Sequence, residues 1–91
     1  MASARLTTTA EDALRAQSPS GREETARALD LLEDDNFREE NKIDLNLREE
    51  GQPVFALVVG RVWIGFLEDQ EGLTSYLSVL HLSLRSRFRP F

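Results

Sequence analysis

The residues best suited to chemistry lie in one short segment near the end of the chain. The sole histidine, His81, is followed by Arg85, Arg87 and Arg89. Side chains in a β-strand point alternately to its two faces. A strand here would place Leu80, Leu82 and Leu84 on one face and His81, Ser83, Arg85 and Arg87 on the other. Imidazole transfers protons near neutral pH and guanidinium groups bind phosphate oxygens. This second face is therefore predicted to meet RNA, a phosphate or an acidic partner.

Each of these residues also has a simpler interpretation. A single histidine in a strand more often lies on the surface or serves the structure. Arginines at a sheet edge commonly protect it from aggregation, and here they would also suit pairing with acidic helices of the same chain. Trp63 has the character of a core residue, although an indole can stack on a base. Tyr76 has the character of a sheet or dimer contact.

The charge of the chain is unevenly distributed. Its 91 residues carry a net charge of −5, with 13 acidic and 7 basic residues in positions 1–50 and 3 acidic and 4 basic residues in positions 51–91. An acidic chain argues against strong nonspecific binding of nucleic acid, which requires several phosphates to be neutralised. A local basic patch can still serve a specific site. With 41% hydrophobic residues, the chain is predicted to be one globular domain, residues 1–91.

Several classes of site and location are disfavoured by the sequence. There is no cysteine, so disulfides and thiolate metal sites are excluded and a cytoplasmic location is expected. The longest apolar runs, 54–60 and 62–67, are too short to cross a bilayer, and the N-terminus does not resemble a signal peptide. The acidic residues between Glu33 and Glu40 lack the spacing of a calcium loop. No cofactor motif is present, so no metal and no cofactor are predicted.

The periodicity of apolar residues changes once along the chain. After a short strand at 3–8, Thr9 with Asp12 and Ser20 with Glu23 resemble the starts of two helices, which would form a hairpin over about 9–34. The second helix would carry an apolar stripe of Thr25, Ala28, Leu29 and Leu32. Residues 33–41 are predicted to be a connection or a frayed helix end. From about 42 to 88, β-branched runs and the alternation of Ile43, Leu45 and Leu47 predict the strands of an antiparallel sheet, with a turn at 69–72 before the last strand. The fold class is therefore α+β: an N-terminal short strand and helix hairpin packed on a three- to four-stranded antiparallel β-meander.

The central strands are apolar on both faces. Val54, Ala56 and Val58 alternate with Phe55, Leu57 and Val59, whereas helices on one side would cover only one face. An uncovered apolar face usually marks an interface. A homodimer through this sheet face, or a protein partner that covers it, is therefore expected.

Three segments together resemble the RelE/ParE superfamily of bacterial toxin–antitoxin toxins. They are the N-terminal segment RLTTTAEDAL (residues 5–14), the strand–glycine–strand unit VFALVVGRVWIGF (54–66) and the terminal strand LHLSLRSRF (80–88). The likeness spans nearly the whole chain at the level of pattern and order. It implies a RelE/ParE-like fold and a cognate antitoxin that neutralises the toxin.

The resemblance also implies a candidate activity and site. RelE-like members cleave messenger RNA on the ribosome with cationic and proton-transferring side chains, whereas ParE-like members poison a topoisomerase. The corresponding groups here are His81, Arg85 and Arg87 for catalysis, with Arg61, Arg85, Arg87 and Arg89 for binding RNA or phosphate. Such chemistry requires cations to stabilise a phosphorane and a group to move a proton.

This chain departs from the family pattern at other basic positions. Ala56 and Trp63 stand where the family usually has arginines, and the lysines before the meander are reduced to Lys42. We therefore expect a toxin-like component of a toxin–antitoxin system whose RNA cleavage and inhibition of translation are weak or lost. The alternative is a non-catalytic protein-interaction or dimerisation domain of the same architecture. A genuine ribosome-dependent endoribonuclease is the third hypothesis.

Overall fold

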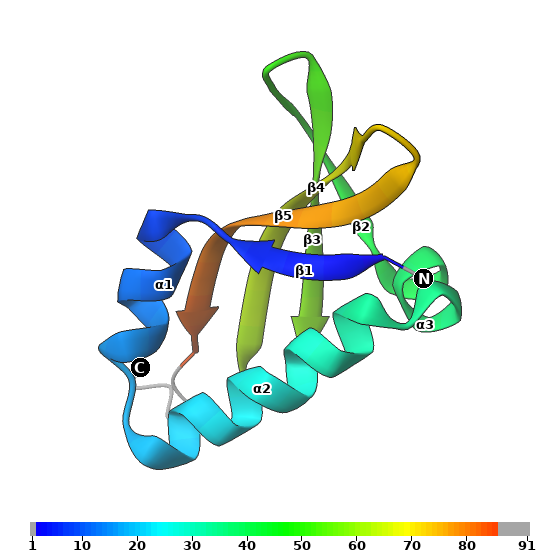
Figure 1. Cartoon of the computed structure of the whole chain (residues 1–91). Helices are drawn as coiled ribbons and strands as arrows, with labels where there is room; N and C mark the ends of the chain where they lie inside the picture. Colours follow the sequence, from blue (N-terminus) through cyan, green and yellow to red (C-terminus); the bar gives the residue numbers. More distant parts are fainter. Residues whose placement is uncertain (1, 86–91) are drawn as a thin grey trace.

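The chain folds into one five-stranded sheet with three helices on one of its faces (Figure 1). The computed structural model describes residues 2–85. In chain order the elements are β1 (Ser3–Leu6), α1 (Thr8–Arg15), α2 (Pro19–Glu33), α3 (Asp35–Asn41), β2 (Ile43–Glu49), β3 (Gln52–Val59), β4 (Val62–Glu71) and β5 (Thr74–Leu84). The predicted α+β class is confirmed.

The sheet joins the two ends of the described chain. Its strand order is β1-β5-β4-β3-β2, so the four strands of the meander are antiparallel neighbours and β1 is added beside the last of them. β1 runs parallel to β5, with Ala4 opposite Leu77 and Leu6 opposite Val79. A parallel pair needs a long crossover connection, which the helices and the rest of the meander supply. The result is four antiparallel strands with one added parallel strand.

Both N-terminal helix caps lie two residues before the predicted positions. Thr7, rather than Thr9, caps α1: its Oγ1 accepts a hydrogen bond from the amide of Ala10 at 3.3 Å. The same hydroxyl donates to the carbonyl of Val79 at 3.0 Å, which ties the start of α1 to β5. Ser18, rather than Ser20, caps α2, and Pro19 occupies the first helical position. Proline is preorganised for that position because its φ is fixed and the missing N–H would have no partner there.

The acidic segment after α2 forms a short helix, where the sequence predicted a connection or a frayed end. Asp34 caps it by accepting from the amide of Phe37 at 3.1 Å. Arg38, only 6% exposed, donates to the carbonyl of Leu32 and to the carboxylate of Asp35, each at 2.8 Å. The hydrogen bond from Arg38 holds the pKa of Asp35 below its ordinary value. A single buried guanidinium thus fixes α3 against the end of α2.

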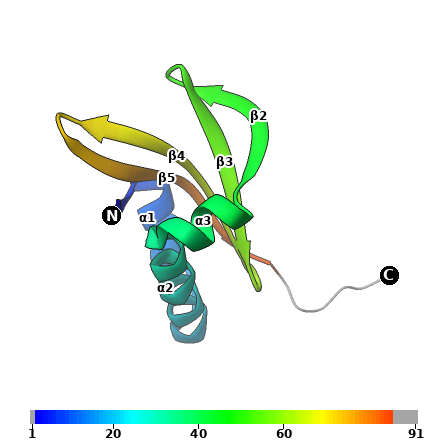
Figure 2. The ribbon, with the colours of Figure 1, turned by 90° about the vertical axis from the view of Figure 1, so that its right-hand side faces the viewer.

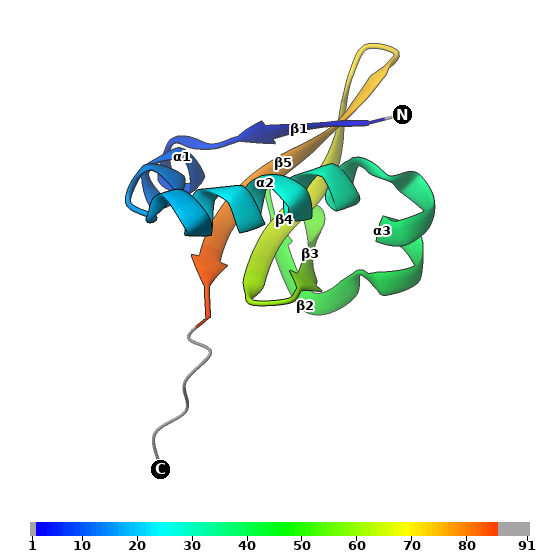
Figure 3. The ribbon, with the colours of Figure 1, turned by 90° about the horizontal axis from the view of Figure 1, so that it is seen from below.

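The core lies between the helices and one face of the sheet. The predicted apolar stripe of α2 faces the core: Thr25, Ala28 and Leu32 are fully buried, and Leu29 is partly buried against them. They meet a set of inward-facing strand residues: Leu57 in β3, Val62, Ile64 and Phe66 in β4, and Leu77, Val79 and Leu82 in β5. Figure 3 shows α2 lying across this face of the sheet. No helix within residues 2–85 is long and apolar enough to cross a bilayer.

A β-bulge interrupts the alternation predicted for the last strand. Gly65 pairs with His81 and Phe66 pairs with Val79, so Leu80 is an extra residue on β5. Leu82 and Leu84 pack in or against the core as predicted, but Leu80 is not among the core residues. A side-chain Cβ at Gly65 would lie 3.3 Å from the Cβ of His81, so glycine provides the room for the bulge. The prediction that Leu80 shares the core face is therefore wrong.

The strand predicted from Ile43, Leu45 and Leu47 is a bulged edge strand. Its pairing with β3 shifts between Asp44 and Leu47, and Asn46 adopts a φ of 58°. Both Ile43 and Leu47 are exposed. The alternation of apolar residues therefore did not produce a half-buried strand. Leu45 and Asn46 have no partner in β3, and these two extra residues turn the chain at the bulge.

The sheet divides into two hairpin arms (Figure 2). β3 and β4 pair only from the turn at Gly60 to the pair Phe55–Phe66. Beyond that pair, β3 remains joined to β2 as far as Gln52, and β4 remains joined to β5 as far as Glu71. β4 ends at Glu71 and β5 begins at Thr74, so the turn between them consists of Gly72 and Leu73. It lies later than the predicted turn at 69–72. We call the space between the two arms the fork.

Loss of the buried guanidinium should destabilise the protein far more than loss of an exposed one. Replacing Arg38 by alanine removes its bonds to Leu32 and Asp35 and strands a buried carbonyl, so Arg38→Ala should lower the free energy of unfolding by about 3 kcal/mol. The matched control is Arg15→Ala, because Arg15 is an exposed helical arginine paired with Glu11 at 2.8 Å. That change should cost about 0.5 kcal/mol or less. Urea denaturation followed by circular dichroism measures both, and equal losses would contradict the role assigned to Arg38.

Candidate functional site

The candidate site lies on the face of the sheet that none of the described helices covers, which we call the open face. The strand register places His81 of β5 in one row with Gly65 of β4 and Ala56 of β3. The next row contains Ser83, Trp63 and Val58. His81 is exposed, while Trp63 is half-buried. The imidazole is therefore accessible, but its neighbours across the sheet supply no charge.

Arg85 directly follows β5 and is exposed. Its backbone amide donates to the carbonyl of Arg61 at 2.7 Å, which extends the β4–β5 pairing by one step. Among residues 2–85, no carboxylate forms an ion pair with the Arg85 side chain. Arg85 is thus the predicted cation that is free to bind an anion. Arg87 and Arg89 lie outside the described residues.

The Arg61 side chain forms an ion pair with helix α2. It lies in the turn between β3 and β4, and its guanidinium forms a close two-point ion pair with Glu24 of α2, including an Nε–Oε1 hydrogen bond at 3.3 Å. The Glu24 hydrogen bond raises the pKa of Arg61 above its ordinary value. Although the backbones of Arg61 and Arg85 pair, the guanidinium of Arg61 is drawn to α2. The structure therefore places His81 on β5 and Arg85 directly after that strand, and it holds the Arg61 guanidinium against α2.

The departures seen in the sequence fall at the centre of the open face. Ala56 is fully buried beside Gly65, and Trp63 lies opposite Val58. An arginine at position 63 would stand next to Ser83, and one at position 56 would lie in the row of His81, two strands away. Small and apolar side chains occupy those rows instead, so at these two described positions the sheet supplies no cation to neutralise the negative charge of a phosphorane.

A second polar cluster on the open face was not predicted. Arg5 of β1 lies over the ring of Tyr76, with its guanidinium carbon 4.1 Å from the ring centroid, and forms an ion pair with Glu71 at 2.9 Å. The Tyr76 hydroxyl donates to Asp69 at 3.1 Å. Arg5 and Tyr76 are brought together by the parallel β1–β5 pairing, so no local motif could have revealed them. We call Arg5, Tyr76, Asp69 and Glu71 the tyrosine cluster.

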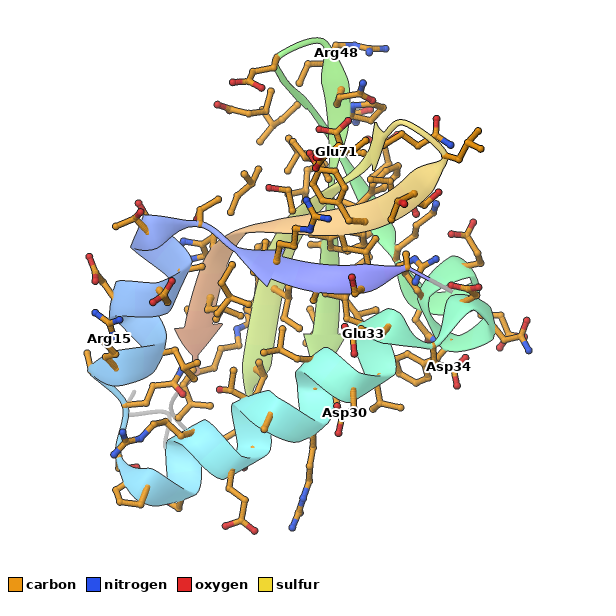
Figure 4. The ribbon with its side chains drawn as sticks, in the orientation of Figure 1. Arg15, Asp30, Glu33, Asp34, Arg48 and Glu71 are labelled. Atoms are coloured by element: carbon orange, nitrogen blue, oxygen red, sulfur yellow. The ribbon has the colours of Figure 1, made fainter. Side chains whose placement is uncertain are left out.

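The acidic segment has structural roles. Figure 4 shows Asp30, Glu33 and Asp34 near the C-terminal end of α2. Glu33 accepts a hydrogen bond from the backbone amide of Ala4 at 2.7 Å, and Asp34 caps α3. Within residues 2–85, no group of three histidine, cysteine or acidic side chains is arranged to hold a metal ion.

An apolar patch lies at the β2 side of the sheet. Ile43 is 50% exposed, Leu47 is 59% exposed and Val58 is 36% exposed. Only part of the expected apolar face is therefore open to solvent, since Ala56 and Val54 are buried by their neighbours. A patch of this kind suits contact with another protein, and the predicted homodimer remains a prediction.

Comparison with known proteins identifies the fold. No protein-family model matches the sequence, and neither does any curated protein. Among solved structures, the chain is similar to one from the toxin–antitoxin complex RelBE2 of Mycobacterium tuberculosis, with a TM-score of 0.71 and 21% sequence identity. The match covers 92% of this chain and 98% of the other. The chain therefore has the RelE-like toxin fold, as its sequence pattern predicted.

The tyrosine cluster can be tested by titration, because Tyr76 is the only tyrosine. Its hydrogen bond to Asp69 raises the pKa of the phenol above the ordinary 10.0, and burial acts in the same direction. The protonated phenol is favoured by folding, so its contribution to stability is complete below pH 10 and is lost as the pH rises through the raised pKa. Ultraviolet absorbance of the phenolate should show ionisation displaced to higher pH. Asp69→Asn should return it towards the ordinary value, and an unchanged titration curve in that variant would contradict the assignment.

Proposed function

We propose that this protein is the toxin-like component of a toxin–antitoxin system and is neutralised in the cytoplasm by a cognate antitoxin. The observation that carries the proposal is the RelE-like fold across 92% of the chain. A shared fold hosts different activities, so the remaining argument depends on the site itself.

Within residues 2–85, the open face offers few cations for cleavage of RNA. Its described cations are a single free guanidinium, Arg85, and Arg5, which Glu71 already neutralises. Arg61 is held by Glu24. Phosphoryl chemistry is accelerated mainly by cations aimed at the developing charge. One imidazole and one free guanidinium supply much less of this stabilisation than a face lined with arginines.

Binding to a protein partner is better supported than catalysis. The exposed side chains of Ile43, Leu47 and Val58 form an apolar patch beside the candidate site. A partner that covers this patch would also lie close to the row containing His81. The second candidate function, a non-catalytic interaction or dimerisation domain, is favoured by the same patch and by the depleted cations.

Growth of the host distinguishes these two functions. Induced expression of the chain alone should arrest growth, and co-expression of the protein encoded by the adjacent open reading frame should restore it. Because Arg85 is the free cation of the site, Arg85→Ala should relieve the arrest without lowering the melting temperature. Normal growth on expression of the wild-type chain would reject the toxin and leave the interaction domain.

Cleavage of messenger RNA on purified ribosomes tests the assignment of residues. Any cleavage by the wild-type protein should fall at least about tenfold in His81→Ala and in Arg85→Ala, since each removes a group that the transition state requires. Arg61→Ala is the matched control, because the Arg61 guanidinium is occupied by Glu24; its rate should change by about twofold or less. Cleavage that survives both site variants would show that the reacting groups lie elsewhere.

A further inference from the structure

The fork exposes the backbone edge of β4 in the interior of the sheet. Pairing between β3 and β4 ends at Phe55–Phe66, whereas β4 continues to pair with β5 through Glu71. Residues 67–71 therefore have a strand neighbour on one side only. A strand with an unpaired edge is a template for another extended chain.

The register identifies the backbone groups that point into the fork. The turns at 60–61 and 72–73 each contain two residues, so Val59–Val62 and Glu71–Thr74 are the closing hydrogen-bonded pairs of their hairpins. Along a strand, the N–H and C=O groups of successive residues point alternately to its two neighbours. In β4, the backbone groups of Glu71 and Asp69 therefore point to β5, and those of Gln70 and Glu68 point away from β5 and towards β3. Their donors and acceptors are the ones that an added strand would use.

Proline explains why β3 does not occupy this edge itself. Continuing the register beyond Phe55–Phe66 would place Pro53 opposite Glu68. Proline has no N–H to donate, so the ladder between these strands is broken at that step. On the β4 side, the amide of Gln70 donates instead to the carboxylate of Asp69 at 2.8 Å.

The fork contains a cavity that both arms line. Its volume is about 430 Å³; Gln52 contributes from β3, Asp69 and Gln70 from β4, Tyr76 from β5 and Arg38 from α3. Figure 4 shows Arg48 on the arm that carries β2 and β3 and Glu71 on the other arm. The cavity lies beside the exposed edge of β4, so side chains of an added strand would have a place to enter.

Both outer edges of the sheet are less available than the fork. At the β1 edge, the amide of Ala4 is occupied by the carboxylate of Glu33. At the β2 edge, a bulge with Asn46 at positive φ breaks the line of the strand, and charged side chains flank it. Bulges and charges are the usual protection of an edge strand. The edge of β4 has neither a bulge nor a covering strand.

The charges that line the fork favour an added strand that carries a basic side chain. Glu68 is already neutralised by Lys42 at 3.2 Å and by Arg38 at 3.4 Å. Among residues 2–85, the groups that donate hydrogen bonds to Asp69 are uncharged: the Tyr76 hydroxyl and the Gln70 amide. If Gln70 exchanged Asp69 for the carbonyl of an added strand, an oxygen of Asp69 would be released to accept a lysine or an arginine.

We propose that an extended segment of the partner protein, carrying a lysine or an arginine, enters the fork and adds as a strand to the edge of β4 at Glu68 and Gln70, with its cation on Asp69. The inference rests on the proposed function, because the partner is the cognate antitoxin. The mode of binding is strand addition, in which backbone hydrogen bonds supply affinity and side-chain pockets supply specificity.

Two substitutions at one position isolate the backbone donor. Gln70→Pro removes the N–H that faces the fork and leaves the pairing between β4 and β5 intact, whereas Gln70→Ala removes the side chain and keeps the N–H. The probe is the purified protein encoded by the adjacent open reading frame, and its dissociation constant is measured by calorimetry. Gln70→Pro should weaken binding at least about tenfold, and Gln70→Ala about twofold or less. Circular dichroism establishes that both variants are folded.

A second comparison tests the charge and does not depend on a proline variant that folds. Asp69→Arg should weaken binding at least about tenfold, because it places a cation against the basic segment. Asp30→Arg makes the same change in net charge on the exposed surface of α2 and should bind like the wild type.

The outcomes separate this inference from the proposed function. Strong binding by the wild-type chain that neither Gln70→Pro nor Asp69→Arg reduces would overturn strand addition in the fork while the toxin–antitoxin pairing stands. No binding by the wild-type chain would overturn the pairing itself, and the fork inference with it.

Discussion

The structure depends on the parallel pairing of β1 with β5. This contact joins residues more than 70 positions apart and places the first strand at the edge of the sheet. The Thr7 hydroxyl reinforces it by capping α1 and bonding to Val79 of β5 at the same time. Because the end of β1 fixes the start of α1, this one pairing also sets where the helices cross the sheet. It further brings Arg5 onto Tyr76 and so creates the tyrosine cluster.

The acidic helices determine which arginines remain available. Glu24 takes Arg61, and Asp35 and Glu68 hold Arg38. The acidic residues of this chain therefore act through particular pairs, and the pair with Glu24 removes the Arg61 guanidinium from the candidate site. Partly buried pairs of this kind have few other partners to exchange with, so the arginine count of the sequence overstates the cations that an anionic ligand would meet. Arg85 directly follows β5 and forms no ion pair with a carboxylate among residues 2–85.

A single proline gives the sheet its divided shape. Pro53 would face Glu68 if β3 and β4 continued to pair, and its missing N–H ends the ladder there. The two hairpins then separate, which leaves a cavity and an unpaired strand edge in the middle of the molecule (Figure 2). The open face and the fork thus offer a partner two different surfaces: apolar side chains on one, and backbone groups with an acidic side chain on the other.

The sequence by itself determined the fold class, the stripe of α2 at Thr25, Ala28 and Leu32, and the absence of arginine from positions 56 and 63. These features are local or periodic, so they can be read along the chain. Only the tertiary structure decided that Leu80 leaves the core face, that Arg61 belongs to Glu24, and that Arg5 meets Tyr76. Bulges and long-range pairs depend on the register between strands, which alternation in a single strand does not specify. Within residues 80–85, the last strand therefore keeps an exposed imidazole and the guanidinium of Arg85, while the neighbours that decide its chemistry come from the fold.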